Sequence, residues 1–113
     1  MRDTVRVRSR RLPFLGRVVW LTADQGGRSS GPPVTPAEHD YAATGFVPPH
    51  TAETGLASFV LKTEHPGSWT SAAEAGWLVT QDDPRFHVRP GTVVVVTEGP
   101  RNVAYFHVET LAD

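Results

Sequence analysis

The sequence contains no cysteine and no long hydrophobic run. Without cysteine the chain can form no disulfide and offers no thiolate for catalysis or for metal binding. No uninterrupted apolar run exceeds the four residues of Val93 to Val96, whereas a membrane-spanning helix needs about 20. The first residues lack the apolar stretch and the cleavage site of a secretory signal. We therefore expect a cytoplasmic protein, with no membrane partner, whose stability comes from packing.

Recognisable motifs of catalysis and metal binding are also missing. The sequence has no Gly-x-Ser-x-Gly motif and no lysine-containing glycine loop for phosphates. The pair Asp82-Asp83 precedes a proline, which is typical of a solvated turn. The histidines have no short paired spacing of the kind that zinc sites use; they are His39, His50, His65, His87 and His107. We expect a protein that is not an enzyme, hydrolyses no nucleotide and binds no metal or other cofactor.

Long helices are hard to place, because ten glycines and ten prolines interrupt the chain. Only 71–75 has a helix-forming composition, and it is one turn long, inside a loop expected over 65–76. The segments between the glycines and prolines are rich in β-branched and aromatic residues, which favour strands. Strands are expected over 4–8, 15–22, 40–47, 55–64, 76–81, 92–97 and 103–111, with a brief pairing at 85–88. The last two strands should form a hairpin.

Six or seven short strands in a chain of this length predict a single all-β domain. A closed barrel or a sandwich would protect the strand edges from solvent. We assign residues 15–113 to the barrel and residues 1–14 to a basic N-terminal arm or a first strand. Trp20 and Trp77 lie in apolar strands and are expected in the core. The segment 92–97 is apolar on both faces and should be covered on both.

The net charge of -1 conceals an uneven distribution. Residues 1–17 contain six arginines and one aspartate, a net charge of +5, whereas residues 18–113 contain five cations and eleven acids, a net charge of -6. Within the arm, Arg6, Arg8 and Arg10 are candidates for contact with phosphate or with an acidic partner. Alternatively, the arm forms a solvated strand face or neutralises the acidic body.

Three features outside the expected strands are candidates for partner contact. Trp69 lies in a polar loop, where an exposed ring can anchor a partner or stack on a base, or can pack as a lid over the barrel end. Two Gly-x-Arg turns, at 26–28 and 99–101, each present an arginine whose donors suit phosphate or carboxylate. Both turns also belong to a wider sequence similarity.

The stretch 18–28, followed by Tyr41 in the next extended segment, resembles the opening of the third domain of elongation factor Tu, where a strand leads to a Gly-Gly-Arg turn. Residues 93–111 resemble the last hairpin of that domain. The resemblance implies a closed six-stranded antiparallel barrel of the Greek-key type. It also implies that Arg28 and Gly99 occupy turns that approach RNA in the family. This sequence departs from the family pattern in having Gly-Pro-Arg at 99–101, Asp83 in place of a basic residue, and alanines at 42–43.

The leading functional prediction is a non-catalytic binding module whose partner is a protein. The first alternative is a translation-related protein that binds RNA, such as tRNA. The second is a small-molecule-binding barrel that uses Tyr41, His65 and Trp69. The candidate contact residues for a protein or RNA partner are Arg6, Arg8, Arg10, Arg28, Trp69, Gly99 and Arg101.

Overall fold

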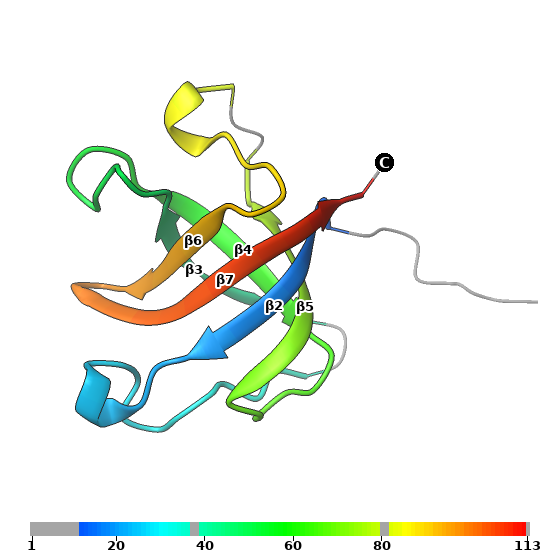
Figure 1. Ribbon diagram of the computed structural model, residues 1–113. Helices are drawn as coiled ribbons and strands as arrows, with labels where there is room; N and C mark the ends of the chain where they lie inside the picture. Colours follow the sequence, from blue (N-terminus) through cyan, green and yellow to red (C-terminus); the bar gives the residue numbers. More distant parts are fainter. Residues whose placement is uncertain (1–11, 37–38, 80–81, 113) are drawn as a thin grey trace, which may run out of the picture.

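The computed structural model describes residues 12–36, 39–79 and 82–112. In these residues the chain forms strands β2 (Phe14–Trp20), β3 (Tyr41–Phe46), β4 (Ala57–Thr63), β5 (Thr70–Trp77), β6 (Val93–Glu98) and β7 (Arg101–Leu111), with short 3-10 helices η1 (Ala23–Gln25) and η2 (Pro84–Phe86) (Figure 1). Within the described residues, neither helix has the length and hydrophobicity that crossing a membrane requires. The strand expected over 4–8 lies outside the described residues.

The six strands close into one antiparallel barrel, in the order β2-β5-β4-β3-β6-β7, with β7 again beside β2. Consecutive hairpins join β3, β4 and β5, and β6 then returns to pair with β3. This return of a fourth strand to the side of the first is the Greek-key arrangement. The expected all-β class and closed six-stranded Greek-key barrel are confirmed.

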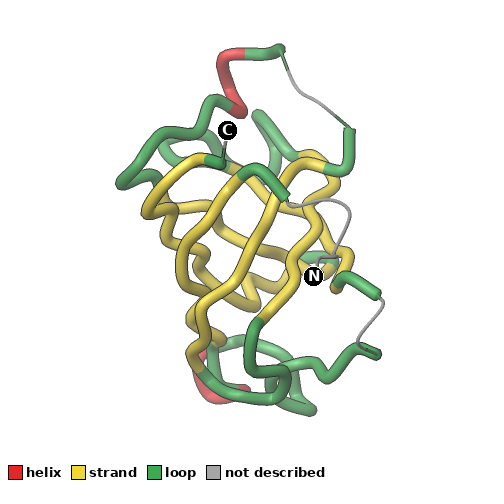
Figure 2. The backbone as a smooth tube through the Cα atoms, turned by 90° about the vertical axis from the view of Figure 1, so that its right-hand side faces the viewer, coloured by secondary structure: helices red, strands yellow, loops and turns green. Residues whose placement is uncertain are grey.

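The connections between strands divide between two ends of the barrel (Figures 1 and 2). The loops that join β2 to β3, β4 to β5 and β6 to β7 form one end, which we call the Arg28 end. The loops that join β3 to β4 and β5 to β6 form the opposite end, which we call the Arg89 end. In Figure 1 the Arg28 end is the lower one and the Arg89 end the upper one.

An aromatic cluster fills the half of the barrel nearer the Arg89 end. Phe59 of β4 is fully buried, and its ring centroid lies 5.0 Å from that of Trp77, 6.1 Å from that of Phe106 and 6.5 Å from that of Phe14. These rings come from four strands, so the cluster joins the sheet across the barrel interior. Trp20 is also buried, and Trp77 is half-buried against the core, so the core assignment of both tryptophans holds.

The final hairpin follows the sequence pattern closely. In β6 all residues from Val94 to Thr97 are buried, so the expectation that this strand is covered on both faces is confirmed. In β7 the buried Phe106 and Val108 alternate with the exposed Tyr105 and His107. This alternation is what one face toward the core and one toward solvent requires.

Three sequence expectations were wrong, and all of them concern the chain between β4 and β6. The expected strand at 76–81 and loop at 65–76 are replaced by β5, which covers Thr70–Trp77. The helix-forming composition of 71–75 is overridden by packing, because the small residues Ser71, Ala73 and Ala75 fill the inner face of the strand. The expected pairing at 85–88 is instead η2, which Asp83 caps by accepting a hydrogen bond from the backbone N of Arg85.

Strand β2 approaches β7 very closely at Gly16. The register of the pair shifts between Leu15 and Gly16. A Cβ atom at Gly16 would lie 1.9 Å from the carbonyl oxygen of His107. Because this neighbour is backbone, only glycine fits here without a shift of one strand.

Candidate binding surface at the Arg28 end

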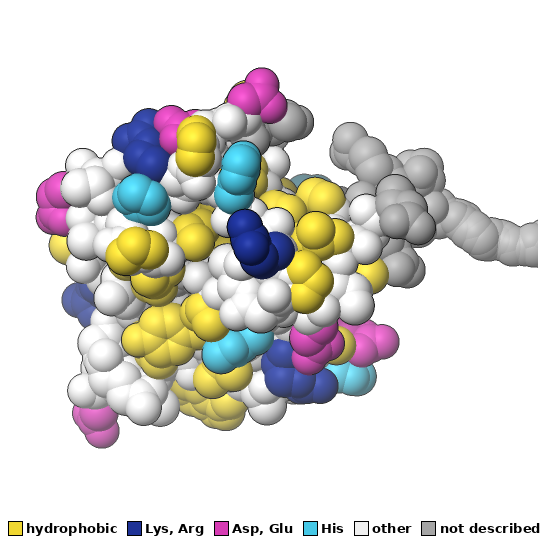
Figure 3. Space-filling model, turned by 45° about the horizontal axis from the view of Figure 1, so that its top comes forward, with side chains coloured by type: hydrophobic (Ala, Val, Ile, Leu, Met, Phe, Trp, Pro, Cys, Tyr) yellow, Lys and Arg dark blue, Asp and Glu magenta, His cyan; other side chains and the backbone are white. Residues whose placement is uncertain are grey.

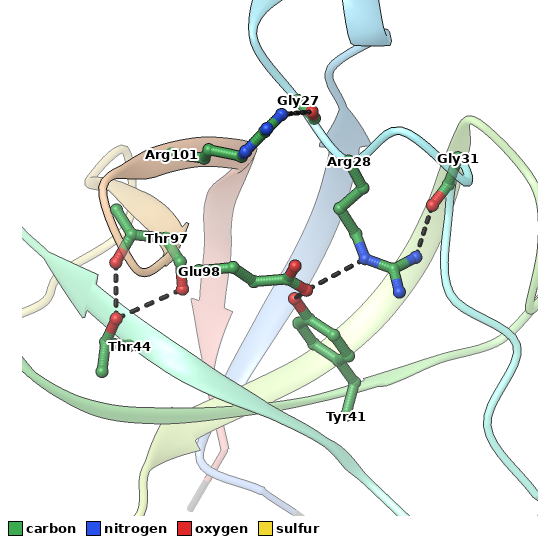
Figure 4. Close-up of polar contacts among 8 residues, drawn as sticks. All are labelled: Gly27, Arg28, Gly31, Tyr41, Thr44, Thr97, Glu98 and Arg101. Carbon is green, nitrogen blue, oxygen red and sulfur yellow. Dashed lines mark hydrogen bonds and ion pairs between the residues drawn. The ribbon is translucent and has the colours of Figure 1, made fainter.

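The two Gly-x-Arg turns lie side by side, although 70 or more residues separate them (Figure 4). From the loop after β2, Arg28 Nε donates to Glu98 Oε2 at the end of β6, at 2.9 Å. From the start of β7, Arg101 Nη1 donates to the carbonyl oxygen of Gly27 at 3.2 Å. The arginine of each turn therefore bonds to a residue in or directly beside the other turn, and these contacts join the two turns.

The loop reaches this position because η1 reverses the chain directly after β2. The backbone N of Thr22 donates to Gln25 Oε1 at 2.8 Å, and the backbone N of Gln25 donates to Thr22 Oγ1 at 3.3 Å. This reciprocal capping box fixes the first turn of the helix. The backbone N of Leu21 donates to the carbonyl of Val103, which ties the start of the loop to β7.

Glu98 also binds Tyr41, the first residue of β3. The Tyr41 hydroxyl donates to Glu98 Oε2, and the Tyr41 ring lies edge-on to Trp20, with centroids 5.2 Å apart. Burial raises the pKa of Tyr41 above its ordinary value, and the hydrogen bond to Glu98 and the negative charge of Glu98 raise it further, against a smaller opposing effect of Arg28. The phenol therefore stays protonated as a donor to the carboxylate.

The Arg28 guanidinium is thus directed into the protein. Its side chain is 23% exposed, and besides Glu98 it donates from Nη1 to the carbonyl oxygen of Gly31 at 2.5 Å. The interaction with Glu98 holds the loop against the barrel, and the hydrogen bond to Gly31 braces the loop internally. That Arg28 also contacts a partner stays a prediction.

Trp69 lies at the same end, as the last residue of the β4–β5 connection, with its ring against the loop after β2. The side chain is 49% exposed. A Cβ atom at Gly31 would lie 3.7 Å from Cη2 of the indole, so the ring rests on the bare backbone of that glycine. The carbonyl of Trp69 accepts a hydrogen bond from the backbone N of Trp20 at 2.9 Å. The backbone of Trp69 is therefore tied to β2, and its ring lies against Gly31 while remaining half-exposed.

Val34 belongs to the same exposed area and was not identified from the sequence. It is 74% exposed, and its Cγ2 atom lies 3.2 Å from the Cβ position at Gly67. The two connections therefore interlock, with Trp69 resting on Gly31 and Val34 on Gly67. We call the exposed side chains of Trp69 and Val34 the Trp69–Val34 surface. An exposed valine in a proline-rich loop has no sequence signature, because only the fold shows where it points.

The other predicted contact residues divide between this end and the undescribed arm. Gly99 is exposed at the tip of the β6–β7 turn, with a φ of 58° and no atom within 4 Å of its Cβ position. Arg101 and His65 are exposed at the same end. The structure therefore brings five predicted residues together at one end, namely Arg28, His65, Trp69, Gly99 and Arg101, with Tyr41 beneath them. Arg6, Arg8 and Arg10 lie outside the described residues.

In the part of the chain that the structure describes, no three carboxylate or imidazole side chains are grouped in a way that would hold a metal ion.

Comparison with models of protein families, with curated proteins and with solved structures found no match for this chain. The functional argument therefore depends on the geometry of the barrel ends.

Proposed function

We propose that this protein is a non-catalytic binding module, related to the third domain of elongation factor Tu, that binds a protein partner through the Trp69–Val34 surface. The observation that carries this proposal is the half-exposed indole of Trp69 held against Gly31. The adjacency of the two Gly-x-Arg turns supports the proposed relationship, since these turns carry the sequence resemblance.

The Trp69–Val34 surface has the properties of a protein-binding hot spot. Tryptophan is enriched among the residues that contribute most to protein interfaces. Because the ring already lies against the Gly31 backbone, we expect its binding to order few further degrees of freedom. Val34 extends the apolar area beside the ring, and both side chains would be withdrawn from water by an apolar recess on a partner.

The charges at this end favour a protein over RNA. Strong RNA binding needs cations that neutralise phosphates. Here the Arg28 cation is paired with Glu98, and residues 18–113 carry a net charge of -6, from five cations and eleven acids. A partner recess that accepts Trp69 and Val34 needs no such cations.

Affinity capture with the full chain as bait tests this proposal. Trp69→Ala and Val34→Ser should each reduce recovery of the same partner protein from a native extract, by about tenfold or more for Trp69→Ala. The matched control is Leu78→Ser, since Leu78 is an equally apolar side chain, 61% exposed, at the Arg89 end. Recovery should be quantified by mass spectrometry, and circular dichroism should show that all variants are folded. Equal recovery by the three variants and the unchanged chain would contradict the proposal.

A mobility-shift titration with tRNA tests the RNA alternative separately. We expect no complex at low salt, where electrostatic binding is strongest. Formation of a complex that weakens steeply with added salt and is lost in Trp69→Ala would overturn the protein-partner proposal and support RNA binding at the same surface.

A further inference from the structure

A groove at the Arg89 end is lined by cationic and imidazole side chains. It lies between the β3–β4 loop and the segment from η2 to β6 and has a volume of about 460 Å³. His50, Arg85, His87 and Arg89 line it, with prolines forming part of the wall, and the described lining residues include no acid. Figure 3 shows arginine or lysine and histidine side chains gathered over this end.

Phe86 explains why its neighbours face outward. The Phe86 side chain is buried, its ring centroid lies 5.0 Å from that of Trp77, and its carbonyl accepts a hydrogen bond from Trp77 Nε1 at 3.1 Å. With Phe86 anchored at the barrel mouth, Arg85 and His87 on either side remain outside and exposed. The backbone is extended at His87, and alternate residues of an extended segment share a side, so Arg89 follows His87 toward the groove.

Arg85 builds the wall of the groove, and its charge is already compensated. Its Nη2 atom lies 2.6 Å from Asp83 Oδ2, and its Nη1 donates to the carbonyl of Thr54 at 2.5 Å. It therefore links the two loops that enclose the groove. Hydrogen bonds from Arg85 lower the pKa of Asp83 to about 2, with a smaller contribution from the nearby His50. The Asp83 carboxylate is thus satisfied by Arg85.

Of the two arginines that line the groove, Arg89 is the one whose charge remains uncompensated by the described residues. Its backbone is fixed by a tight turn, in which the N of Arg89 donates to Thr92 Oγ1 at 3.1 Å and the N of Thr92 donates to the carbonyl of Arg89 at 2.9 Å. Its guanidinium is exposed and makes no ion pair or hydrogen bond with any residue in 12–36, 39–79 or 82–112. This contrasts with Arg28 and Arg85, which are both paired with carboxylates.

We infer that this groove binds a phosphate group, either as the free ion or as part of a small organic phosphate. The guanidinium of Arg89 presents paired N–H donors that match two oxygens of a phosphate. The imidazoles of His50 and His87 supply further donors from two sides of the groove. The adjacent prolines form an apolar wall suited to the organic part of such a ligand. The inference concerns the opposite end of the barrel and does not depend on the proposed protein partner.

Titration of the isotope-labelled full chain with inorganic phosphate, followed by amide NMR spectra, tests the inference. We expect saturable shifts of the amide signals of His50 and of residues 85–89 and 91–92, beyond those caused by sodium chloride of equal ionic strength. Arg89→Gln should weaken phosphate binding by about tenfold or more without loss of fold, since its guanidinium holds no other segment. The matched control Arg17→Gln removes an exposed arginine from β2 and should leave binding unchanged.

A parallel titration with phenyl phosphate distinguishes the two sources of the phosphate group. Tighter binding of phenyl phosphate than of inorganic phosphate supports a small organic phosphate, and equal binding supports the free ion. Shifts that do not saturate, that chloride reproduces, or that persist in Arg89→Gln would mean an adventitious ion only and would overturn the inference.

Discussion

At the scale of single residues, Glu98 organises the Arg28 end. One of its carboxylate oxygens accepts hydrogen bonds from both Arg28 and Tyr41, so the end of β6, the loop after β2 and the start of β3 meet at one atom. Its side chain is 37% exposed, and ion pairs this accessible contribute about 1 kcal/mol or less. The main effect of Glu98 is therefore to order the loop that supports the Trp69 ring.

Tyr41 gives this network a measurable pH dependence. Because the pKa of Tyr41 is raised in the folded state, the folded protein keeps the phenolic proton to a higher pH than the unfolded chain does. The resulting stabilisation is complete below the ordinary phenol pKa of about 10 and is lost as the pH rises above it. Between about pH 9 and about pH 11, we expect the free energy of unfolding to fall more in the unchanged protein than in Tyr41→Phe.

Denaturant unfolding at a series of pH values measures this difference. The chain has two tyrosines, and Tyr105→Phe is the matched control because Tyr105 is exposed on β7. Tyr105→Phe should retain the profile of the unchanged protein. An identical alkaline profile in Tyr41→Phe would show that the phenol ionises freely in the folded state.

At the scale of elements, the close contact between β2 and β7 makes a sharp prediction for Gly16. In Gly16→Ala the added methyl would overlap the carbonyl of His107, so one of the two strands must move. We expect a loss of at least about 2 kcal/mol in the free energy of unfolding, measured by denaturant titration.

Gly55→Ala is the control for this substitution. A Cβ atom at Gly55 would meet its nearest neighbours, in Arg85 and His50, at 3.4 Å or more, which is ordinary van der Waals contact. Its stability should change by about 0.5 kcal/mol or less. A Gly16→Ala variant as stable as Gly55→Ala would argue against the register of β2 and β7 described above.

The strands that the sequence predicted are those in which the local preference and polarity of each residue agree with its burial in the barrel. Strand β6 and the alternating β7 were identified because valine and aromatic residues favour strands and because one face of β7 is polar. Strand β5 was missed because alanine and serine favour other structures locally. Ala73 and Ala75 belong to a core cluster that also contains the large rings of Phe59 and Phe106, and that packing is visible only in the closed barrel.

The candidate sites also divide into features that the local sequence indicates and features that only the closed barrel shows. Arg28 and Arg101 were identified from the two Gly-x-Arg turns, and the family resemblance points to Arg28 and Gly99. The structure places all three residues at one end. The groove at the Arg89 end was not predicted, because His50 and Arg89 come from different loops and become neighbours only through the order of the strands. Nothing in the local sequence of either loop indicates that arrangement.

At the scale of the whole molecule, the aromatic cluster should determine how cooperatively the barrel unfolds. Phe59 is fully buried and contacts rings from three other strands. We expect Phe59→Ala to lower the free energy of unfolding by about 3–5 kcal/mol, a large part of the stability of a typical domain. Urea titration followed by tryptophan fluorescence should show an earlier single transition.

Leu56→Ala provides the comparison, since Leu56 is an exposed apolar residue just before β4. It should cost about 1 kcal/mol or less. If Phe59→Ala costs no more than Leu56→Ala, the ring cluster is not the core of the folded barrel.

The barrel closes where its first and last described strands meet, and this closure brings the two ends of the described chain together. The backbone N of Ala112 donates to the carbonyl of Pro13 at 2.7 Å, beside the Arg89 end and opposite the Trp69–Val34 surface. Residues 13–112 therefore enter and leave the fold at one point, as an insert in a surface loop of a host protein must do. In such a fusion, the barrel would display the Trp69 ring on the side that faces away from the host protein.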